Sequence, residues 1–543
     1  MDAVHGYHEN TKHSFHRFAR SLGYLDWAAQ PDPFRHYAGA PRVDLPRAAL
    51  RPDLPYATLF DGGAPPARLN EAAMGEFLRC SLGLSAWKQY QKSRWALRVN
   101  PSSGNLHPTE CYIVWQGRVC HYAPREHALE VRAVAAEATV RSDQGVVPHG
   151  SLVLPEDAFV VGLTSILWRE MWKYGERAFR YCQHDIGHAI GALRFAAALL
   201  GWRVRLVDNC SHDQLATLLG VNRDQDYGEA EREEPECLLL VSAVTDRDLD
   251  IPALVDGAQR ASWTGQANVL SRTRVEWPVV DEVAHATRQL DAARMHAGRQ
   301  SHPGRHLLHP PSSSAQSGMT PPSARELIIQ RRSALGFDAS SMLSQEQFLP
   351  MLRRLRPGPS PWDSVSWPAC VHLVLFVHRV AGLHPGVYMY LRDPAAREAL
   401  AAAMRTDFLW EPAGDPEDST DLFLLVPADV RFTANRLSCD QDIAADGFFS
   451  LGMLARFDEA LRQCGPWFYR RLFWECGLIG QVLYLEAEAV GGRATGIGCY
   501  YDDAVHDVLG LSGTAWQTLY HFSMGVPVDD GRLTSEPGYP GGW

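Results

Sequence analysis

Short runs of consecutive apolar residues alternate along the chain with two long blocks of helix-forming composition. The apolar runs have the length and content of buried strands. They lie at 110–115, 158–163 and 237–244, and again at 371–377, 422–426 and 516–524. The helical blocks are residues 180–202 and 470–492. Strands that alternate with helices in both parts of the chain predict an α+β or α/β fold.

The two helical blocks repeat each other at a constant spacing of 290 residues. The spacing relates identical residues, which are Arg180/Arg470, Gly187/Gly477, Leu193/Leu483, Gly201/Gly491, Leu219/Leu509 and Gly220/Gly510. Two amphipathic helices can align by chance, but one spacing shared by two separate segments argues against chance. We therefore expect a chain built of two similar halves.

A segment rich in Pro, Ser and Gly divides the chain. Residues 304–323 (GRHLLHPPSSSAQSGMTPPS) show no helical or strand periodicity, so they cannot bury enough apolar surface to offset their ordering entropy. A helical stretch at 279–300 precedes them. The predicted organisation is an N-terminal arm, a first domain, a linker and a second domain, at 1–60, 61–300, 301–323 and 324–543. Within the arm we expect residues 7–41, which are rich in His and aromatic residues, to be non-periodic and to pack on the core or over a substrate.

Composition and charge narrow the class of protein. The 543 residues are 46% hydrophobic and 21% charged, which is typical of a globular chain, and a net charge of −11 gives no basic field for nucleic acid. No apolar run reaches the ~20 residues of a membrane-spanning helix, and the first residues lack the apolar stretch of a secretory signal. The 11 cysteines contain no CxxC pair, which indicates free thiols in a reducing compartment. We therefore expect a cytoplasmic protein.

The first half carries a polar loop, NPSSGNLHP, before one of its apolar strands. Pro101 fixes a turn, and the hydroxyls of Ser102 and Ser103 are available to a ligand. Gly104 lets a ligand approach the backbone, and Asn105 can donate and accept hydrogen bonds at once. Such a loop suits a planar heterocycle with a mixed donor and acceptor edge. The alternative is an ordinary turn that leads into a strand.

The second half opens with a helix that ends in Arg331, Arg332 and Ser333. Two guanidiniums and a hydroxyl suit a phosphate, because planar forks bind anionic oxygens bidentately. The alternative is a solvated helix face, where Arg pairs are common. Ser344 and Gln347 then form the pattern of a capping box at the next helix.

Small residues follow the second helical block in the segment TGIGCYYDD. Gly496 and Gly498 flank Ile497, so main-chain N–H groups there can meet the edge of a ligand. The chain closes with MGVPVDDGRL, which places Arg532 after a strand.

The order of NPSSGNLHP, RRS, TGIGCYYDD and the terminal MGVPV…R resembles the nitroreductase family. Within it the chain is most similar to the SagB-type dehydrogenases, which include the azoline oxidases of ribosomal-peptide biosynthesis. The resemblance covers 324–533 more fully than 70–320. It implies an α+β fold in which two tandem FMN-dependent nitroreductase-like domains form an intrachain pseudo-dimer.

The resemblance also implies a cofactor site. In the family, FMN lies at a dimer interface, where one subunit supplies an Arg-Ser pair, a Gly-rich segment and a C-terminal Arg, and the other supplies the PSSxN loop. The positions of this chain that match are Pro101, Ser102, Ser103, Asn105, Arg331, Arg332, Ser333, Gly496, Ile497, Gly498 and Arg532. The N–H groups of the glycine segment would stabilise the anionic edge of the reduced flavin.

The two halves differ at these positions. At the spacing of 290, the residues matching Gly496–Gly498 are Leu206, Val207 and Asp208, and no RRS occurs near Pro41. In place of the polar loop, the second half has GPSPWDSVSWP at 358–368, without the Gly-Asn pair. We therefore predict one intact composite FMN site per chain and one degenerate counterpart.

Lys173 and Tyr174 resemble a Lys-Tyr pair that azoline oxidases carry beside the flavin. Dehydrogenation sends a hydride to flavin N5 and a proton to a base. Both side chains keep their protons at neutral pH, so a base needs burial or a cationic neighbour. We expect Arg177 and Arg180 to lower the pKa of Tyr174. The alternative is a solvated lysine beside a core tyrosine.

The expected function is that of an FMN-dependent oxidoreductase that oxidises a heterocycle or a peptide-derived substrate. Two alternatives stay open, a nitro or quinone reductase driven by NAD(P)H and a flavin-free docking subunit of a peptide-modifying complex. His184 and His188 form an H-D-x-x-H pattern, but Asp replaces the zinc-peptidase Glu and no third ligand is marked. We interpret them as part of a buried helix and expect no metal. Expected partners are a small molecule or peptide, with no nucleic acid or membrane, and further homo-oligomerisation stays open.

Overall fold

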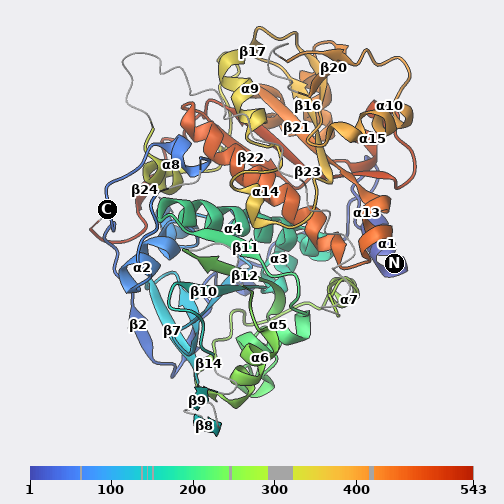
Figure 1. Ribbon diagram of the computed structural model, residues 1–543. Coiled ribbons are helices and arrows are strands. Elements are labelled where there is room, and N and C mark those ends of the chain that lie inside the picture. Colours follow the sequence, from blue (N-terminus) through green and yellow to red (C-terminus); the bar gives the residue numbers. More distant parts are fainter. Residues whose placement is uncertain are drawn as a thin grey trace.

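The computed structural model describes the chain except residues 62–63, 136–138, 143–144, 149–151, 244–247, 291–321, 415–420 and 542–543. The described residues form two α+β halves, each built on one large sheet (Figure 1). The long helices α4 (Ala178–Leu199) and α14 (Phe468–Ala489) lie side by side between the two sheets (Figure 1). The linker predicted at 301–323 lies outside the described residues, apart from its last two positions.

The sheet of the first half has eight strands, with the path β11-β12-β10-β5-β6-β7-β13 and β2 paired with β7. The bounds are β2 Arg42–Asp44, β5 Thr109–Trp115, β6 Arg118–Ala123, β7 Ala128–Val134, β10 Ala158–Ser165, β11 Arg203–Leu206, β12 Glu234–Ser242 and β13 Ser262–Trp263. The predicted apolar strands of this half coincide with β5, β10 and β12. These are neighbours at the centre of the sheet, where both faces are covered.

The sheet of the second half has seven strands, with the path β19-β20-β18-β16-β21-β23-β22. The bounds are β16 Val371–Val377, β18 Gly386–Tyr390, β19 Glu411–Pro412, β20 Leu422–Pro427, β21 Phe449–Arg456, β22 Arg493–Ile497 and β23 Trp516–Gly525. The apolar runs predict β16, β20 and β23. They do not predict the central strand β21, whose sequence FSLGMLAR mixes Ser, Gly and Arg with its apolar residues.

The helices of the two halves correspond at the spacing found in the sequence. Helices α4 and α14 are both 22 residues long and begin 290 residues apart. The same spacing relates α3 (Leu167–Tyr174) to α13 (Phe457–Cys464), and α5 (His212–Leu219) to α15 (Asp502–Leu509). The expected pseudo-dimer of two similar halves is therefore confirmed.

The other elements are short. The helices are α1 Asp2–Asn10, α2 Glu71–Arg79, α6 Ile251–Arg260, α7 Pro278–Ala286, α8 Ala324–Gln330, α9 Gln345–Arg353, α10 Arg397–Ala403, α11 Arg431–Leu437 and α12 Ile443–Asp446. The strands are β1 Tyr37–Ala38, β3 Leu84–Tyr90, β4 Ser93–Arg98, β8 Thr139–Ser142, β9 Gly145–Pro148, β14 Gln266–Ala267, β15 Leu343–Ser344, β17 Val380–Ala381 and β24 Thr534–Pro537. Helix α9 begins with the predicted capping box. Among the described helices, none combines the length and apolar character that a bilayer crossing requires.

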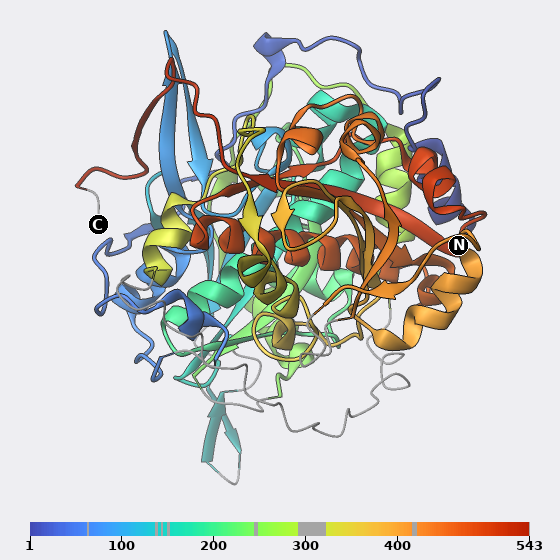
Figure 2. The same cartoon turned by 90° about the horizontal axis from the view of Figure 1, so that it is seen from above.

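Both ends of the chain contact the opposite half. Helix α1 forms with Val4, Tyr7 and His8 buried, at helical spacing. It ends within the first residues of the segment 7–41 that is predicted to be non-periodic, and most of that segment has no helix or strand. His8 contacts Tyr469 of α14, and its Nε2 lies 2.9 Å from Gln517 Oε1. At the other end, β24 pairs with β3 and completes a three-stranded sheet with β4 (Figure 2). The helix of the arm is thus stabilised by tertiary packing, which composition does not reveal.

Candidate functional site

The polar loop of the first half is a compact turn with a preset shape. Gly104 and Asn105 have φ values of 59° and 60°, in the left-handed region that glycine and asparagine tolerate best. The side chain of Asn105 is used within the loop, because Nδ2 donates to Ala96 O at 2.9 Å and Oδ1 lies 2.9 Å from His107 Nε2. Gly104 is exposed at the tip, where a ligand can reach the backbone.

Two buried carboxyl groups lie beneath this loop. The backbone N and the Oγ of Ser103 each donate to Asp185 Oδ1 at 3.0 Å. Burial raises the pKa of Asp185 to about 7, although these hydrogen bonds act in the opposite direction. Glu170 of α3 is also buried, and neither of its carboxyl oxygens has a partner among the described residues. Its burial, helped by Asp185, raises the pKa of Glu170 well above its usual value.

Glu170 belongs to no predicted motif, and Asp185 stands only in the H-D-x-x-H pattern, where it replaces the zinc-peptidase Glu. Glu170 and Asp185 stand in segments that are otherwise buried, on α3 and α4. An acidic residue within such a segment is the signal that could have marked them, because a carboxyl group is rarely buried without a role or a partner.

The structure brings the predicted Lys-Tyr pair against the loop. A Cβ atom at Gly104 would lie 2.6 Å from the Tyr174 hydroxyl and 3.0 Å from Lys173 Nζ. Both residues end α3, which stops at Gly175 with a φ of 54°. The pair therefore lies on the ligand-accessible side of the loop.

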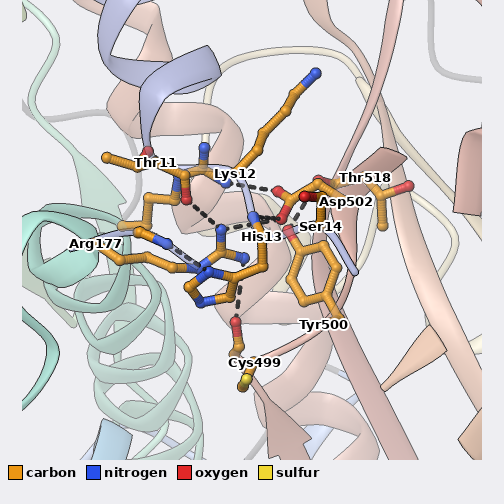
Figure 3. A network of polar contacts seen from close by, with 12 residues as sticks. Thr11, Lys12, His13, Ser14, Arg177, Cys499, Tyr500, Asp502 and Thr518 are labelled. Atoms are coloured by element: carbon orange, nitrogen blue, oxygen red, sulfur yellow. Dashed lines mark hydrogen bonds and ion pairs between the residues drawn. The ribbon is translucent and has the colours of Figure 1, made fainter. Parts of the chain in front are cut away.

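The expectation that Arg177 and Arg180 lower the pKa of Tyr174 is wrong. Both arginines are directed to Asp502 of the second half, with N–O distances of 3.0 and 2.8 Å. Figure 3 shows Arg177 and Asp502 in this cluster. Removal from water and the nearby Glu170 raise the pKa of Tyr174 well above its usual value. Tyr174 therefore keeps its proton at neutral pH and is suited to donate a hydrogen bond.

Aromatic rings connect the loop of the first half to the glycine segment of the second. The ring centroids of Tyr174 and Tyr181 are 4.4 Å apart. The Tyr181 hydroxyl donates to Gly498 O at 3.1 Å, and a Cβ atom at Gly498 would collide with the Tyr181 ring. The two halves thus meet here by a contact that only glycine permits.

A second tyrosine joins two of the predicted ligand segments. Gly496 N donates to the Tyr484 hydroxyl at 3.1 Å, and this hydroxyl lies 2.9 Å from Ser333 Oγ. Ser333 itself is exposed, whereas the side chain of Ile497 is buried in the core. The hydroxyl of Ser333 and the backbone at Gly496 are therefore held together at the same edge of the sheet.

Arg331 reaches from the second half to the base of the loop. Its Nε and Nη2 donate to Val99 O and Arg98 O, at 3.2 and 3.3 Å. Its Nη1 has no partner among the described residues, and Arg331 is only 4% exposed. Within the described part of the chain no carboxylate forms an ion pair with it. A buried cation without a counter-charge is costly, so this position is suited to bind an anion.

The other two arginines are placed differently. The side chain of Arg332 is used within the protein, because Nη1 and Nη2 donate to Ile329 O and Ser85 O. Arg532 is 73% exposed in its side chain and pairs with Asp530 at 2.7 Å. The structure therefore brings together the loop, Lys173, Tyr174, Arg331, Ser333 and the glycine segment, but leaves Arg532 at the surface.

The two halves are related by pseudo-symmetry, so the candidate site has a counterpart on the other side of the pseudo-dimer. Protein side chains fill this equivalent position. Asp208 and Arg471, which correspond to Gly498 and Tyr181, form an ion pair of 2.9 Å. The Arg471 side chain is 4% exposed and lies over the Trp467 ring at 4.5 Å. The cavity that remains measures about 20 Å³, which is room for one water molecule.

A second ion pair closes the same position. Arg194 corresponds to Tyr484 at the spacing of 290, and it forms two hydrogen bonds of 2.8 Å to the carboxylate of Asp363. Asp363 belongs to the segment 358–368, the counterpart of the polar loop. In the equivalent position, charged pairs therefore occupy the places that tyrosines and glycines hold in the candidate site.

The H-D-x-x-H histidines pack across the interface between the halves. The His184 ring stacks on Tyr520 at 4.0 Å, and its Nε2 lies 3.0 Å from Leu519 O. His188 Nε2 lies 3.3 Å from the Tyr520 hydroxyl. Both histidines are directed to β23 of the second half, which fits the interpretation as part of a buried helix. The described residues contain no group of three or more His, Cys, Asp or Glu arranged for a metal.

Comparison with known proteins identifies the second half. The family model "Nitroreductase family" matches residues 328–526, which include Arg331, Ser333 and the glycine segment. This part of the chain is therefore similar to the nitroreductase family. The comparison with curated proteins gave no match.

Solved structures extend the similarity to both halves. A putative nitroreductase from Anabaena variabilis is 18% identical, with a TM-score of 0.63 over 97% of this chain and 99% of that chain. A likeness at 18% identity shows the fold alone, and here the shared fold extends over 97% of the chain. A chain of the E. coli microcin synthetase McbBCD complex is 19% identical (37% of this chain, 70% of that chain, TM-score 0.28). A putative nitroreductase from Ralstonia eutropha is 16% identical (40% and 89%, TM-score 0.27).

Proposed function

We propose that the protein is an FMN-dependent oxidoreductase of the SagB type with one composite flavin site per chain. The observation that carries this proposal is the meeting of the Gly104 loop with the Gly498 segment, from opposite halves, through Tyr174 and Tyr181. The equivalent position is closed by two ion pairs. An unequal pair of positions supports one flavin per chain.

The residues around Arg331 fit the phosphate of FMN. The unpartnered Nη1 of Arg331 and the exposed hydroxyl of Ser333 would bind its oxygens, with Arg332 alongside. Arg532 would contribute only after leaving Asp530. The contribution of Arg532 to FMN binding is therefore expected to be smaller than that of Arg331, because Arg532 gives up an existing ion pair.

The isoalloxazine would contact the two glycine-containing segments beside the rings of Tyr174 and Tyr181 that join them. The backbone of Ile497 and Gly498 would face one edge, and Pro101, Ser102, Ser103 and Asn105 would form the opposing wall. FMN supplies the hydride acceptor. Backbone dipoles held in fixed positions stabilise developing negative charge without reorganisation.

Lys173 and Tyr174 would handle the proton at the substrate. The Tyr174 hydroxyl keeps its proton, so it would hold the substrate by a hydrogen bond. Lys173 Nζ lies beside Gly104 of the loop, and in its uncharged form it would receive the proton that the substrate loses when its hydride goes to the flavin. We propose a heterocycle or a peptide-derived molecule as the substrate, in the cytoplasm, where the 11 free cysteines would persist.

The direct test is an absorbance spectrum of the purified protein with a flavin-to-protein ratio. A ratio near one is expected, whereas a ratio near two contradicts the closed second position. Arg331→Ala should weaken FMN binding by on the order of 1–3 kcal/mol, or roughly 5–150-fold in Kd. Arg532→Ala serves as the matched surface variant and should weaken it less.

Two other outcomes would replace the proposal. Bleaching of the flavin by NAD(P)H, followed by turnover of nitro compounds or quinones, would favour a reductase. A protein that binds no FMN, when purified or when FMN is added, would favour a docking subunit of a peptide-modifying complex.

A further inference from the structure

Two cysteines from separate segments of the second half meet beside the glycine segment. Cys499 directly follows Gly498, and Cys439 follows helix α11. Their Sγ atoms are 2.9 Å apart. A disulfide bond is ~2.05 Å long, so an approach of roughly 1 Å would join them.

This pair differs from the other cysteines of the chain. Eight of the remaining cysteines are buried, and Cys464 is exposed without a second sulfur beside it. Cys439 and Cys499 are both half-buried, so a small reagent can reach them. In the part of the chain that the structure describes, no other two sulfurs lie within hydrogen-bond distance.

The backbone already holds the two segments together. Cys439 and Asp440 form a tight turn, with φ values of 55° and 58°. Gln441 Nε2 donates to Ser438 O at 2.7 Å and to Cys499 O at 3.1 Å. Bond formation between the sulfurs therefore closes a contact that is already ordered, which lowers its entropic cost.

The two thiols are not equivalent. The contact with Cys439, together with the positive charge of Arg177, lowers the pKa of Cys499. The same contact raises the pKa of Cys439, because a second negative charge at this distance is unfavourable. Cys499 is therefore the thiol suited to act as nucleophile. Figure 3 shows Cys499 beside the cluster of Arg177 and Asp502.

We propose that Cys439 and Cys499 form a reversible disulfide by exchange with a small disulfide such as oxidised glutathione. The Cys499 thiolate attacks one sulfur of the reagent, forms a mixed disulfide and releases one glutathione thiolate. Cys439 then loses its proton to solvent and attacks Sγ of Cys499, which releases the second glutathione. Two protein thiols are oxidised, one glutathione disulfide is reduced to two thiols, and excess reduced glutathione reverses both steps.

The disulfide would act on the segment that the proposed flavin site uses. Gly498 O accepts hydrogen bonds from Arg177 and Tyr181 of the first half, at 3.2 and 3.1 Å. Movement of Cys499 toward Cys439 would act directly on this carbonyl. The disulfide itself goes beyond the proposed function and does not depend on it, because it requires only the two thiols.

The test uses the full-length protein, incubated with graded ratios of reduced to oxidised glutathione and then alkylated. Peptide mass spectrometry should detect a Cys439–Cys499 cross-link that rises with oxidised glutathione and disappears in excess reduced glutathione. Cys439→Ser should instead accumulate glutathione on Cys499, because the resolving thiol is gone. Cys499→Ser should abolish the cross-link and leave Cys439 less reactive.

Cys464→Ser is the matched control, because it removes an exposed cysteine outside the pair and should leave the cross-link unchanged. Glutathione attached to Cys464 of the wild-type protein, with both pair cysteines still alkylated at every ratio, would overturn the proposal. A cross-link between other cysteines would also overturn it. These measurements on the wild-type protein decide the matter even if a serine variant fails to fold.

Discussion

Gly187 of α4 and Gly477 of α14 face each other where the two helices cross. A Cβ atom at Gly187 would collide with Trp474 O and lie 2.8 Å from Gly477 Cα. A Cβ atom at Gly477 would collide with His184 O and lie 2.8 Å from Gly187 Cα. The contact is reciprocal because the two residues occupy equivalent positions in the two halves. The backbones of the helices are therefore in contact, and the interface has no room for a side chain here.

Gly187→Ala should destabilise the protein by about 1–3 kcal/mol, the usual cost of an extra methyl in a packed interior. The atoms it meets are backbone, which cannot move aside as a side chain can. Chemical denaturation measures the effect. Gly6→Ala in α1 is the control, because its Cβ atom would meet nothing within 4 Å. It should be neutral or slightly stabilising, since alanine is the better helix former. Equal effects of the two variants would contradict the backbone contact.

Gly104→Ala should reduce flavin content and turnover together. The new Cβ atom would press on the Tyr174 hydroxyl and Lys173 Nζ, at 2.6 and 3.0 Å. Gly117→Ala is matched to it, because Gly117 also has a positive φ, of 72°, but its Cβ atom would meet only Ala135 Cβ at 3.7 Å. Both variants introduce the same kind of backbone strain, but only Gly104→Ala adds close contacts. Only Gly104→Ala should therefore change the spectrum of bound flavin. A loss of flavin in both would mean that strain alone explains the effect.

Arg471→Ala should destabilise the fold without changing the flavin ratio. It leaves Asp208 without its partner, and because the Asp208 side chain is 19% exposed and can be hydrated, the expected cost is about 1–3 kcal/mol. Because this pair lies in the position opposite to the proposed site, one flavin should still bind. Arg405→Ala, which breaks an exposed pair with Asp407, should leave stability unchanged. If the folded Arg471→Ala protein binds less flavin per chain than the wild type, a cofactor binds where the ion pair of Asp208 and Arg471 lies.

Asp185→Asn should change how stability depends on pH. The folded protein holds the Asp185 proton up to about pH 7, whereas an unfolded chain releases it near its usual pKa of 3.8. At this site the unfolded state therefore binds fewer protons between these values, and the contribution of Asp185 to the free energy of unfolding falls as pH rises from about 4 to 7.

The asparagine variant lacks this titration, so its unfolding free energy should gain relative to that of the wild type as pH rises over the same range. The difference between the two proteins should change by on the order of 4 kcal/mol, since one pKa unit corresponds to about 1.4 kcal/mol. Urea unfolding at several pH values measures it. Asp530→Asn, at an exposed ion pair, should keep the wild-type slope between pH 4 and 7. The same slope in wild type and Asp185→Asn would show that Asp185 is ionised in the folded state.

Much of the architecture follows from the sequence because it rests on local patterns. The spacing of 290 residues predicts the correspondence of α4 with α14, and the apolar runs predict the central strands except β21. The resemblance to the nitroreductase family also predicts that the loop around Gly104 and the segment around Gly498 share one site.

What the sequence does not reveal depends on contacts between distant segments. The pairing of Asp208 with Arg471 joins residues far apart in the chain, and neither shows periodicity that links it to the other. The burial of Glu170 and the meeting of Cys439 with Cys499 are of the same kind. Arg532 illustrates the converse, because its motif suggests a phosphate ligand while Asp530, two residues away, pairs with it instead.

The last strand of the chain, β24, completes the small sheet whose hairpin leads into residues 101–105. Tyr539 extends this anchor, since its hydroxyl accepts from Leu84 N at 2.9 Å. Removal of this C-terminal segment by a carboxypeptidase would loosen residues 101–105, which the first half contributes to the candidate site. None of the removed residues is itself a proposed ligand. Tags, fusions and proteolytic nicks at the C-terminus are therefore expected to alter cofactor retention from a distance.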